Sequence, residues 1–260
     1  SILQKIIDYE NGGIGGNWVK TVLLSMKPSD SNTPGYHLGE AILRDVVQPE
    51  GFNSIRVYEA NYGLNPAPDY TPCNYNNVLT AWNRRAGFHF WWTHGNTNLA
   101  SDIFTSSRCQ YLDNNSPAFV FQCSCLNGYP EASDNLGYSL LKQGAIATIS
   151  ASRVSWYYPS QVDFTNTDSN AGMTYRFANK LINSRLPCGD AFYQMLLHVP
   201  KQIWMNHCVF NLYGDPSVAY ASGPLVSHNP YPDTDNNILP YSISATVSSN
   251  GALKSGSPSI

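Results

Sequence analysis

Two reactive side chains stand where neighbouring strands of the expected sheet end. His94 follows the apolar run FHFWWT (88–93), and Cys125 ends the run AFVFQCSC (118–125). Consecutive strands of an α/β sheet are usually neighbours, and functional groups gather at the carboxyl ends of its strands. A thiol is mostly protonated at neutral pH, so an imidazole that removes its proton produces the reactive thiolate and can later protonate a leaving amine. The pattern predicts a Cys125/His94 pair for acyl transfer.

Gly95 follows the candidate imidazole directly and adds a second part of the same chemistry. Without a Cβ, the backbone N–H of Gly95 can approach a substrate carbonyl oxygen closely. Together with the N–H of Cys125 it would form an oxyanion hole, in which each donor stabilises the transition state by about 3–4 kcal/mol. The sequence therefore predicts both a nucleophile and the donors that stabilise its tetrahedral intermediate.

Other interpretations of these residues stay open from spacing alone. Cys125 could be a small buried apolar residue, and His94 an ordinary loop histidine. Cys123 competes as the nucleophile because alternate residues of a strand share one face, although Cys125 lies at the exit that a substrate reaches. The three side chains could also bind a metal, but they lack a clear fourth ligand. We expect no metal site here.

The segments around these residues alternate between strand-like and helix-like patterns. Apolar runs indicate strands at 19–26, 53–61, 88–93, 118–125, 145–152 and within 208–222. Helical periodicity indicates helices at 2–10, 37–48, 77–87, 134–144, about 170–184 and 189–199. This alternation is typical of βαβ units with right-handed crossovers. We expect a doubly wound, mainly parallel α/β domain over residues 1–222, with helices on both faces.

The composition changes after Ala221. Residues 222–240 are rich in Pro, Asn, Asp and Ser, and residues 241–249 alternate as one half-exposed strand. Because one strand cannot bury a core, residues 223–260 either begin a truncated β-sandwich or supply an edge strand to the main domain. The acidic PDTD (232–235) could contribute to a structural calcium site, although solvated loop carboxylates are the simpler interpretation.

Charge and composition exclude several classes of function. The net charge is −3 and charged residues make up 13% of the chain, with no basic cluster beyond Arg84-Arg85. Neither nucleic acid nor anionic lipid is therefore an expected partner. No apolar run reaches the about eighteen residues of a membrane-spanning helix. The polar, weakly charged composition favours a secreted or cell-surface protein, and the first residues indicate a processed piece rather than a signal peptide.

The cysteines indicate neither a zinc ribbon nor a thioredoxin-like site. The chain has 6 cysteines at irregular spacing, without a C-x-x-C pair. In a secreted protein, some of those other than Cys125 could form disulfides, and the sequence does not select a pairing.

Several of these segments resemble the gingipain-type cysteine peptidases of the caspase-like clan. WWTHGN (91–96) is similar to their strand-His-Gly segment. FVFQCSCLNG (119–128) is similar to their strand ending in Cys-Val-Asn-Gly, which favours Cys125 over Cys123 as nucleophile. Further likenesses follow the family order at IIDYENG (6–12), ATISASRVSW (147–156) and NLYGDPSV (211–218).

The resemblance implies a caspase-like fold followed by the start of an immunoglobulin-like domain. It implies a secreted bacterial endopeptidase in which Cys125 and His94 cleave peptide bonds through a thioester intermediate, with no required cofactor. Protein or peptide substrates are the implied partners, together with the family's N-terminal subdomain or a propeptide. The alternative is a catalytically silent surface module that binds proteins or glycans.

The chain departs from the family at two points near the expected site. Asp30, in SMKPSD (25–30), is the candidate for the acid that orients His94. The acidic P1-pocket residue of arginine-specific members has no clear counterpart in residues 32–40, so basic-residue specificity is not implied. Trp156 is the candidate for a wall of the P1 pocket, with a core position as the alternative.

Overall fold

The computed structural model describes residues 1–11, 16–197, 202–220, 225–228 and 245–248. The chain divides into two compact units, Ser1–Tyr220 and Ala221–Ile260. This division falls next to the change of composition after Ala221.

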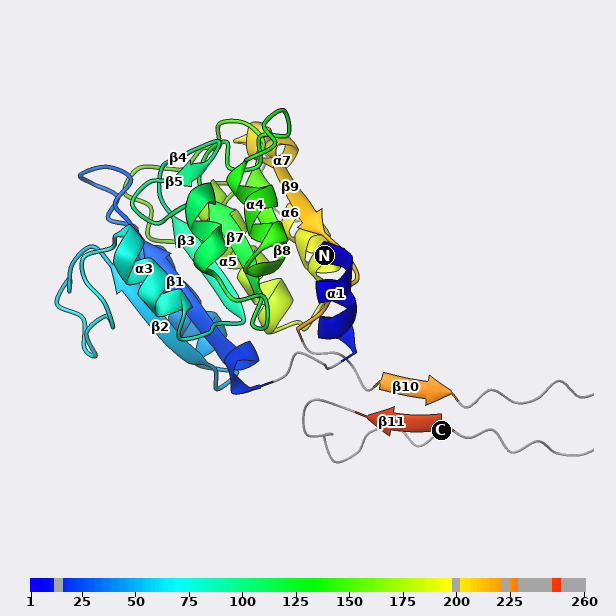
Figure 1. Ribbon diagram of the computed structural model, residues 1–260. Helices are drawn as coiled ribbons and strands as arrows, with labels where there is room; N and C mark the ends of the chain where they lie inside the picture. Colours follow the sequence, from blue (N-terminus) through cyan, green and yellow to red (C-terminus); the bar gives the residue numbers. More distant parts are fainter. Residues whose placement is uncertain (12–15, 198–201, 221–224, 229–244, 249–260) are drawn as a thin grey trace, which may run out of the picture. The chain divides into compact units, whose positions relative to one another are not determined.

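A six-stranded sheet forms the centre of the first unit (Figure 1). Its strands, in spatial order, are β2 (Asn53–Tyr58), β1 (Thr21–Met26), β3 (Phe88–Trp92), β7 (Ala118–Cys123), β8 (Ala145–Ala151) and β9 (Phe210–Gly214). Neighbouring strands are parallel except for β8 and β9, which are antiparallel. The expected doubly wound, mainly parallel sheet is confirmed.

Helices cover both faces of this sheet, because side chains on alternate strand positions build two separate apolar clusters. One cluster includes residues of α1 (Ile2–Glu10), α2 (Tyr36–Ile42), α5 (Asn170–Ile182) and α6 (Cys188–Leu197). The other includes residues of α3 (Tyr75–Trp82) and α4 (Leu136–Lys142). Within the described part of the chain, no helix has the length and apolar character needed to cross a membrane.

Several short elements were not indicated by the sequence, because they span too few residues to show a period. They are the 3-10 turns η1 (Asn17–Lys20) and η3 (Ser106–Tyr111), the helix α7 (Trp204–Val209) and the strands β4 (Gly95–Asn96), β5 (Leu99–Ala100) and β6 (Phe104–Thr105). The helix expected at 37–48 is present as α2 followed by the π-helical turn η2 (Leu43–Val47). The three strands form a small antiparallel sheet directly after His94.

In the second unit, β10 (Leu225–His228) pairs antiparallel with β11 (Ala245–Ser248). The sequence indicated only the second strand, within 241–249. The acidic PDTD (232–235) lies outside the described residues, so the calcium site stays a prediction, as does the β-sandwich.

All 6 cysteines lie in the described residues of the first unit, and all are free thiols. Four are buried, Cys208 is exposed, and Cys125 is partly exposed.

Candidate active site

His94 and Cys125 follow adjacent parallel strands at the same edge of the sheet. Every residue of β3 and β7 is buried, and their register places Trp92 opposite Cys123. The N–H of Thr93 donates to the Cys123 carbonyl at 3.1 Å, so the pairing continues to the residue before His94. The two buried strands therefore fix the starting points of both loops that carry the candidate residues.

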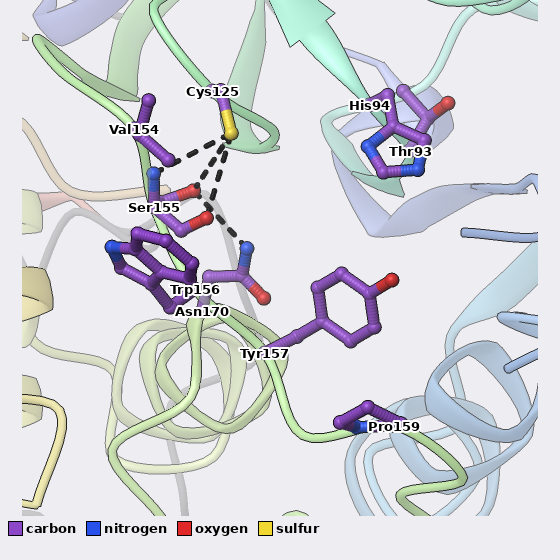
Figure 2. A pocket seen from close by; sticks show the side chains of 9 residues that line it. All are labelled: Thr93, His94, Cys125, Val154, Ser155, Trp156, Tyr157, Pro159 and Asn170. Carbon is purple, nitrogen blue, oxygen red and sulfur yellow. Dashed lines mark hydrogen bonds between the residues drawn. The ribbon is translucent and has the colours of Figure 1, made fainter. Parts of the chain in front are cut away.

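Both residues line one pocket of about 340 Å³. In Figure 2, the Cys125 sulfur and the His94 ring face it from opposite sides. The lining residues are Thr93, His94, Cys125, Val154, Ser155, Trp156, Tyr157, Pro159 and Asn170. The structure thus brings the predicted nucleophile, its predicted proton-transfer partner and Trp156 to one place.

The His94 ring is held by the loop that follows β1. Its Nε2 lies 2.6 Å from the carbonyl oxygen of Ser29. Because a carbonyl only accepts hydrogen bonds, Nε2 carries a proton, and in the neutral ring Nδ1 then has the free lone pair that a general base requires. The ring also makes an edge contact with Tyr157, with ring centroids 6.5 Å apart.

Asp30 is next to Ser29, but its carboxylate is hydrogen-bonded to other groups. Its Oδ2 accepts from the Tyr157 hydroxyl at 2.8 Å, and its Oδ1 accepts from the Asn32 N–H at 2.8 Å. The described hydrogen bond of the His94 ring is thus with the Ser29 carbonyl, one residue before the expected acid. Asp30 instead joins the loop after β1 to the loop after β8.

The Asp30–Tyr157 hydrogen bond shifts both pKa values. The hydroxyl of Tyr157 is the main cause that lowers the pKa of Asp30 below its usual range. Burial, followed by the bond to Asp30, raises the pKa of Tyr157 to about 12. A carboxyl group with a lowered folded-state pKa contributes stability above its ordinary pKa, and this contribution is lost as the pH falls through the lowered value.

Replacing Tyr157 with phenylalanine is expected to raise the pKa of Asp30 toward its ordinary value, because the largest cause of the shift is removed. The free energy of unfolding should then fall less steeply as the pH is lowered through the acid range, because the contribution from Asp30 is already absent. The measurement is a carbon-13 NMR titration of the aspartate carboxyls, with an Asp30→Asn protein to assign the resonance. An unchanged pKa would show that the bond does not persist in solution.

Ser155 surrounds the Cys125 thiol with backbone and side-chain groups. The Cys125 Sγ donates to the Ser155 carbonyl oxygen at 3.4 Å, and the Ser155 N–H donates to Sγ at 3.4 Å. The Ser155 hydroxyl lies 3.9 Å from Sγ. After deprotonation, an N–H directed at the sulfur stabilises the thiolate. Ser155 therefore fixes the thiol at the pocket and offers a donor to its reactive form.

A buried hydrogen-bond network joins the two loops that carry His94 and Cys125. Asn127 is fully buried. Its Nδ2 donates to the carbonyls of Asn96 at 2.5 Å and Leu99 at 2.8 Å, and its Oδ1 accepts from the Ser124 hydroxyl. The asparagine two residues after Cys125 thus holds the small sheet after His94 against the loop after β7.

Gly95 packs directly against the backbone of Cys125. A Cβ on Gly95 would lie 2.5 Å from the carbonyl oxygen and 3.0 Å from the nitrogen of Cys125. The two segments that carry the expected oxyanion donors are therefore in close contact. The sequence suggested glycine here for access of the substrate, and the structure adds a packing reason for it.

A Gly95→Ala substitution is expected to lower kcat/KM about 10- to 100-fold, because the backbone of Cys125 must move to accommodate the new methyl group. Gly63→Ala serves as the control: a Cβ at Gly63 meets nothing within 4 Å, so its cost is the backbone strain of an alanine at a φ of 70°, which the unfolding measurement reports. The measurements are turnover of a peptide substrate and thermal unfolding of both variants. Equal turnover by the Gly95 and Gly63 variants would contradict the expectation.

Trp156 lies at the pocket with 48% of its surface exposed, which rules out a core position. Its backbone is fixed by Asn206, which is fully buried in α7. The Asn206 Oδ1 accepts from the Trp156 N–H at 2.9 Å, and its Nδ2 donates to the Trp156 carbonyl at 2.9 Å. The paired bonds hold the indole-bearing residue in place beside Cys125.

Comparison with known proteins identifies the family. The model of peptidase family C25 matches residues 1–221. The chain belongs to this family. No curated protein sequence matches the chain.

Solved structures share the fold of this C25 chain. The crystal structure of the Arg-specific cysteine proteinase gingipain R (RgpB) matches with a TM-score of 0.66 and 16% identity, over 87% of this chain and 55% of that chain. A second protease structure matches with a TM-score of 0.66 and 16% identity, over 94% and 58%. The complex of the Porphyromonas gingivalis RgpB pro- and mature domains matches with a TM-score of 0.60 and 12% identity, over 87% of this chain and 56% of that chain. The resemblance to gingipains and the caspase-like fold are confirmed.

Cys123 occupies a different environment from Cys125 in this C25 chain. It is completely buried in the apolar cluster that includes α5, and burial raises the pKa of its thiol. Within the described residues, no group of three or more His, Cys, Asp or Glu side chains could hold a metal ion.

Proposed function

We propose that this chain is a cysteine endopeptidase in which Cys125 is the nucleophile and His94 transfers protons. The proposal is carried by one observation: the two side chains follow adjacent buried strands and face a single pocket. Membership of family C25 supports the reaction class. The bond from His94 to the Ser29 carbonyl supports the role of Nδ1 as the proton acceptor.

In this mechanism, His94 takes the proton of the Cys125 thiol, and the thiolate attacks the scissile carbonyl carbon to form a C–S bond. The N–H groups of Gly95 and Cys125 stabilise the oxyanion. Collapse of the intermediate breaks the C–N bond, and His94 gives its proton to the leaving amine. Water, deprotonated by His94, then attacks the thioester and releases the free thiol and the carboxylic acid.

The surroundings of the dyad have supporting roles in this proposal. The Ser29 carbonyl orients the imidazole, and Asp30 acts on the site through Tyr157. Trp156 forms a wall of the P1 pocket, because it is half exposed and lines the cavity beside Cys125. The reaction needs no metal or organic cofactor, since the thiolate supplies the nucleophile.

We further propose secretion and a pro-segment as a partner. The RgpB pro- and mature domains form a complex in a structure that shares this fold, and the present chain covers 56% of that structure's chain. The N-terminal subdomain of the family is an equivalent candidate. Protein or peptide substrates follow from the reaction class.

The proposal is tested by labelling the reduced protein with peptidyl acyloxymethyl ketones that differ at P1, followed by intact mass and peptide mapping. We expect one adduct, on Cys125, that is absent from Cys125→Ala and much slower to form in His94→Ala. A folded protein that stays unlabelled, also when supplied with its pro-segment or N-terminal subdomain, would refute the peptidase proposal. It would favour the protein- or glycan-binding module.

A further inference from the structure

The pocket beside Cys125 is walled mostly by apolar and aromatic side chains. Trp156 is 48% exposed and Val154 is 45% exposed, while the ring of Tyr157 completes the wall (Figure 2). Apart from His94 and Cys125, the described polar members of the lining are uncharged at neutral pH. They are Thr93, Ser155, Tyr157 and Asn170.

Charged side chains that are bonded to pocket residues, or that lie near them in sequence, already have partners or are buried. Asp30 accepts from Tyr157 at 2.8 Å, Asp168 is only 1% exposed, and Arg153 pairs with Glu131 at 2.6 Å. None of these is among the residues that line the cavity. A basic or acidic substrate side chain would therefore lose its hydration here without gaining a counter-ion, which is strongly unfavourable.

Asn170 is a pocket residue whose buried side chain has an unused hydrogen-bonding atom. It is 3% exposed, and its Nδ2 donates to the Ser155 hydroxyl at 3.1 Å. Its Oδ1 has no hydrogen-bond partner among the described residues. A buried carbonyl without a donor is costly. This oxygen exposes less than 1 Å² to solvent, so a ligand N–H that removes the cost reaches it through a small shift of the side chains that line the pocket.

The backbone of Asn170 is fixed, so the position of this atom is well defined. Asn170 is the first residue of α5, and its N–H donates to the Trp156 carbonyl at 2.8 Å. Its own carbonyl accepts from the Thr174 hydroxyl at 2.9 Å. In Figure 2, the carboxamide lies between the rings of Trp156 and Tyr157.

We propose that the pocket binds an uncharged P1 side chain that ends in a carboxamide, and that Asn170 selects for it. The inference rests on the proposed peptidase function, since it assigns the residue before the scissile bond. A carboxamide offers an N–H donor to Oδ1, carries no charge and is planar, which suits the aromatic walls. A site built around one hydrogen bond rejects analogues that lack the matching group.

Matched substrates test this selection in the wild-type chain. One peptide sequence carries Asn, Leu, Asp or Arg at P1, where Leu and Asp have the approximate shape of Asn. We expect kcat/KM for the Asn peptide to exceed those for the Leu, Asp and Arg peptides by about 10-fold or more. A preference for Arg, Asp or Leu would overturn the proposal while leaving the peptidase function intact.

An Asn170→Asp substitution should change the preference rather than abolish turnover. The new carboxylate supplies the missing counter-ion, so the ratio of kcat/KM for Arg over Asn should rise by about 10-fold or more. Asn183→Asp is the matched control at the C-cap of the same helix, where Asn183 donates to the Asp45 carbonyl. Because a damaged fold cannot produce a gain for Arg, an unchanged ratio in Asn170→Asp would contradict the role of Asn170.

A binding experiment separates this inference from the peptidase proposal. The Cys125→Ala chain is titrated calorimetrically with acyl peptides that end at P1 in Asn, Leu, Asp or Arg amides. Binding of the Asn peptide that is tighter by about 10-fold or more supports the pocket assignment. It does so even if the wild type shows no turnover, because absent turnover would refute only the catalytic role. Equal binding of the four peptides would overturn the assignment whatever the turnover.

Discussion

Replacing Cys125 with alanine is expected to lower kcat/KM by about 10⁴-fold or more, because the covalent route is lost with the sulfur. The fold should persist, since the side chain is only partly buried and, within the described part of the chain, its hydrogen bonds are all with Ser155. Turnover of a peptide substrate, thermal unfolding and circular dichroism of the variant provide the measurement.

Cys123→Ala is the matched control, two residues earlier in the chain. Cys123 is fully buried, and burial raises its pKa, so its thiol stays protonated and inaccessible. We expect this variant to lose about 1–2 kcal/mol of stability from the smaller side chain and to keep turnover within a fewfold of wild type. If a folded Cys123→Ala protein lost as much turnover as Cys125→Ala, Cys125 would no longer be assigned as the nucleophile.

The position of the site could be predicted from the sequence because it depends on the sheet. Apolar runs without alternation, such as those of β3 and β7, are typical of strands buried on both faces. His94 and Cys125 each follow such a run, and adjacent parallel strands end at the same edge. The adjacency of β3 and β7 and the shared pocket follow from these facts.

The loop residues that complete the pocket around His94 and Cys125 could not be predicted from the ends of strands. Ser29 contributes a backbone carbonyl, which leaves no signature in the residue type. Ser155 and Tyr157 belong to a loop without a period, and their partners Cys125 and Asp30 are 30 and 127 residues away in the chain. Asn170 was indicated only as the start of a helix.

The contrast between side chains, which a sequence displays, and backbone groups, which it does not, also explains why sequence and structure give different groups for orienting His94. The sequence selected Asp30 because a carboxylate is the usual side chain for that task, and side chains are what a sequence displays. In the structure the chain approaches His94 through the carbonyl of Ser29, and the adjacent carboxylate is directed to Tyr157. The two arrangements predict different consequences of removing the charge of Asp30.

Replacing His94 with alanine is expected to lower kcat/KM by about 10²–10⁴-fold, the range for loss of a general acid–base group. Asp30→Asn should keep turnover within a fewfold of wild type, because the Ser29 carbonyl still orients the ring and an asparagine oxygen can still accept from Tyr157. The measurements are the pH profiles of kcat/KM for both variants and the response of His94→Ala to added imidazole.

Partial recovery of His94→Ala by imidazole would show that the lost group acts in proton transfer rather than in folding. An Asp30→Asn protein that loses as much activity as His94→Ala would show that the charge of Asp30 stabilises the imidazolium, despite the contact with Ser29. If Asp30→Asn and Tyr157→Phe instead lost the same share of turnover, Asp30 would act by positioning Tyr157 in the pocket wall. The hydrogen bonds of the structure favour near-wild-type turnover for Asp30→Asn, since the described hydrogen-bond partner of the His94 ring is the carbonyl of Ser29.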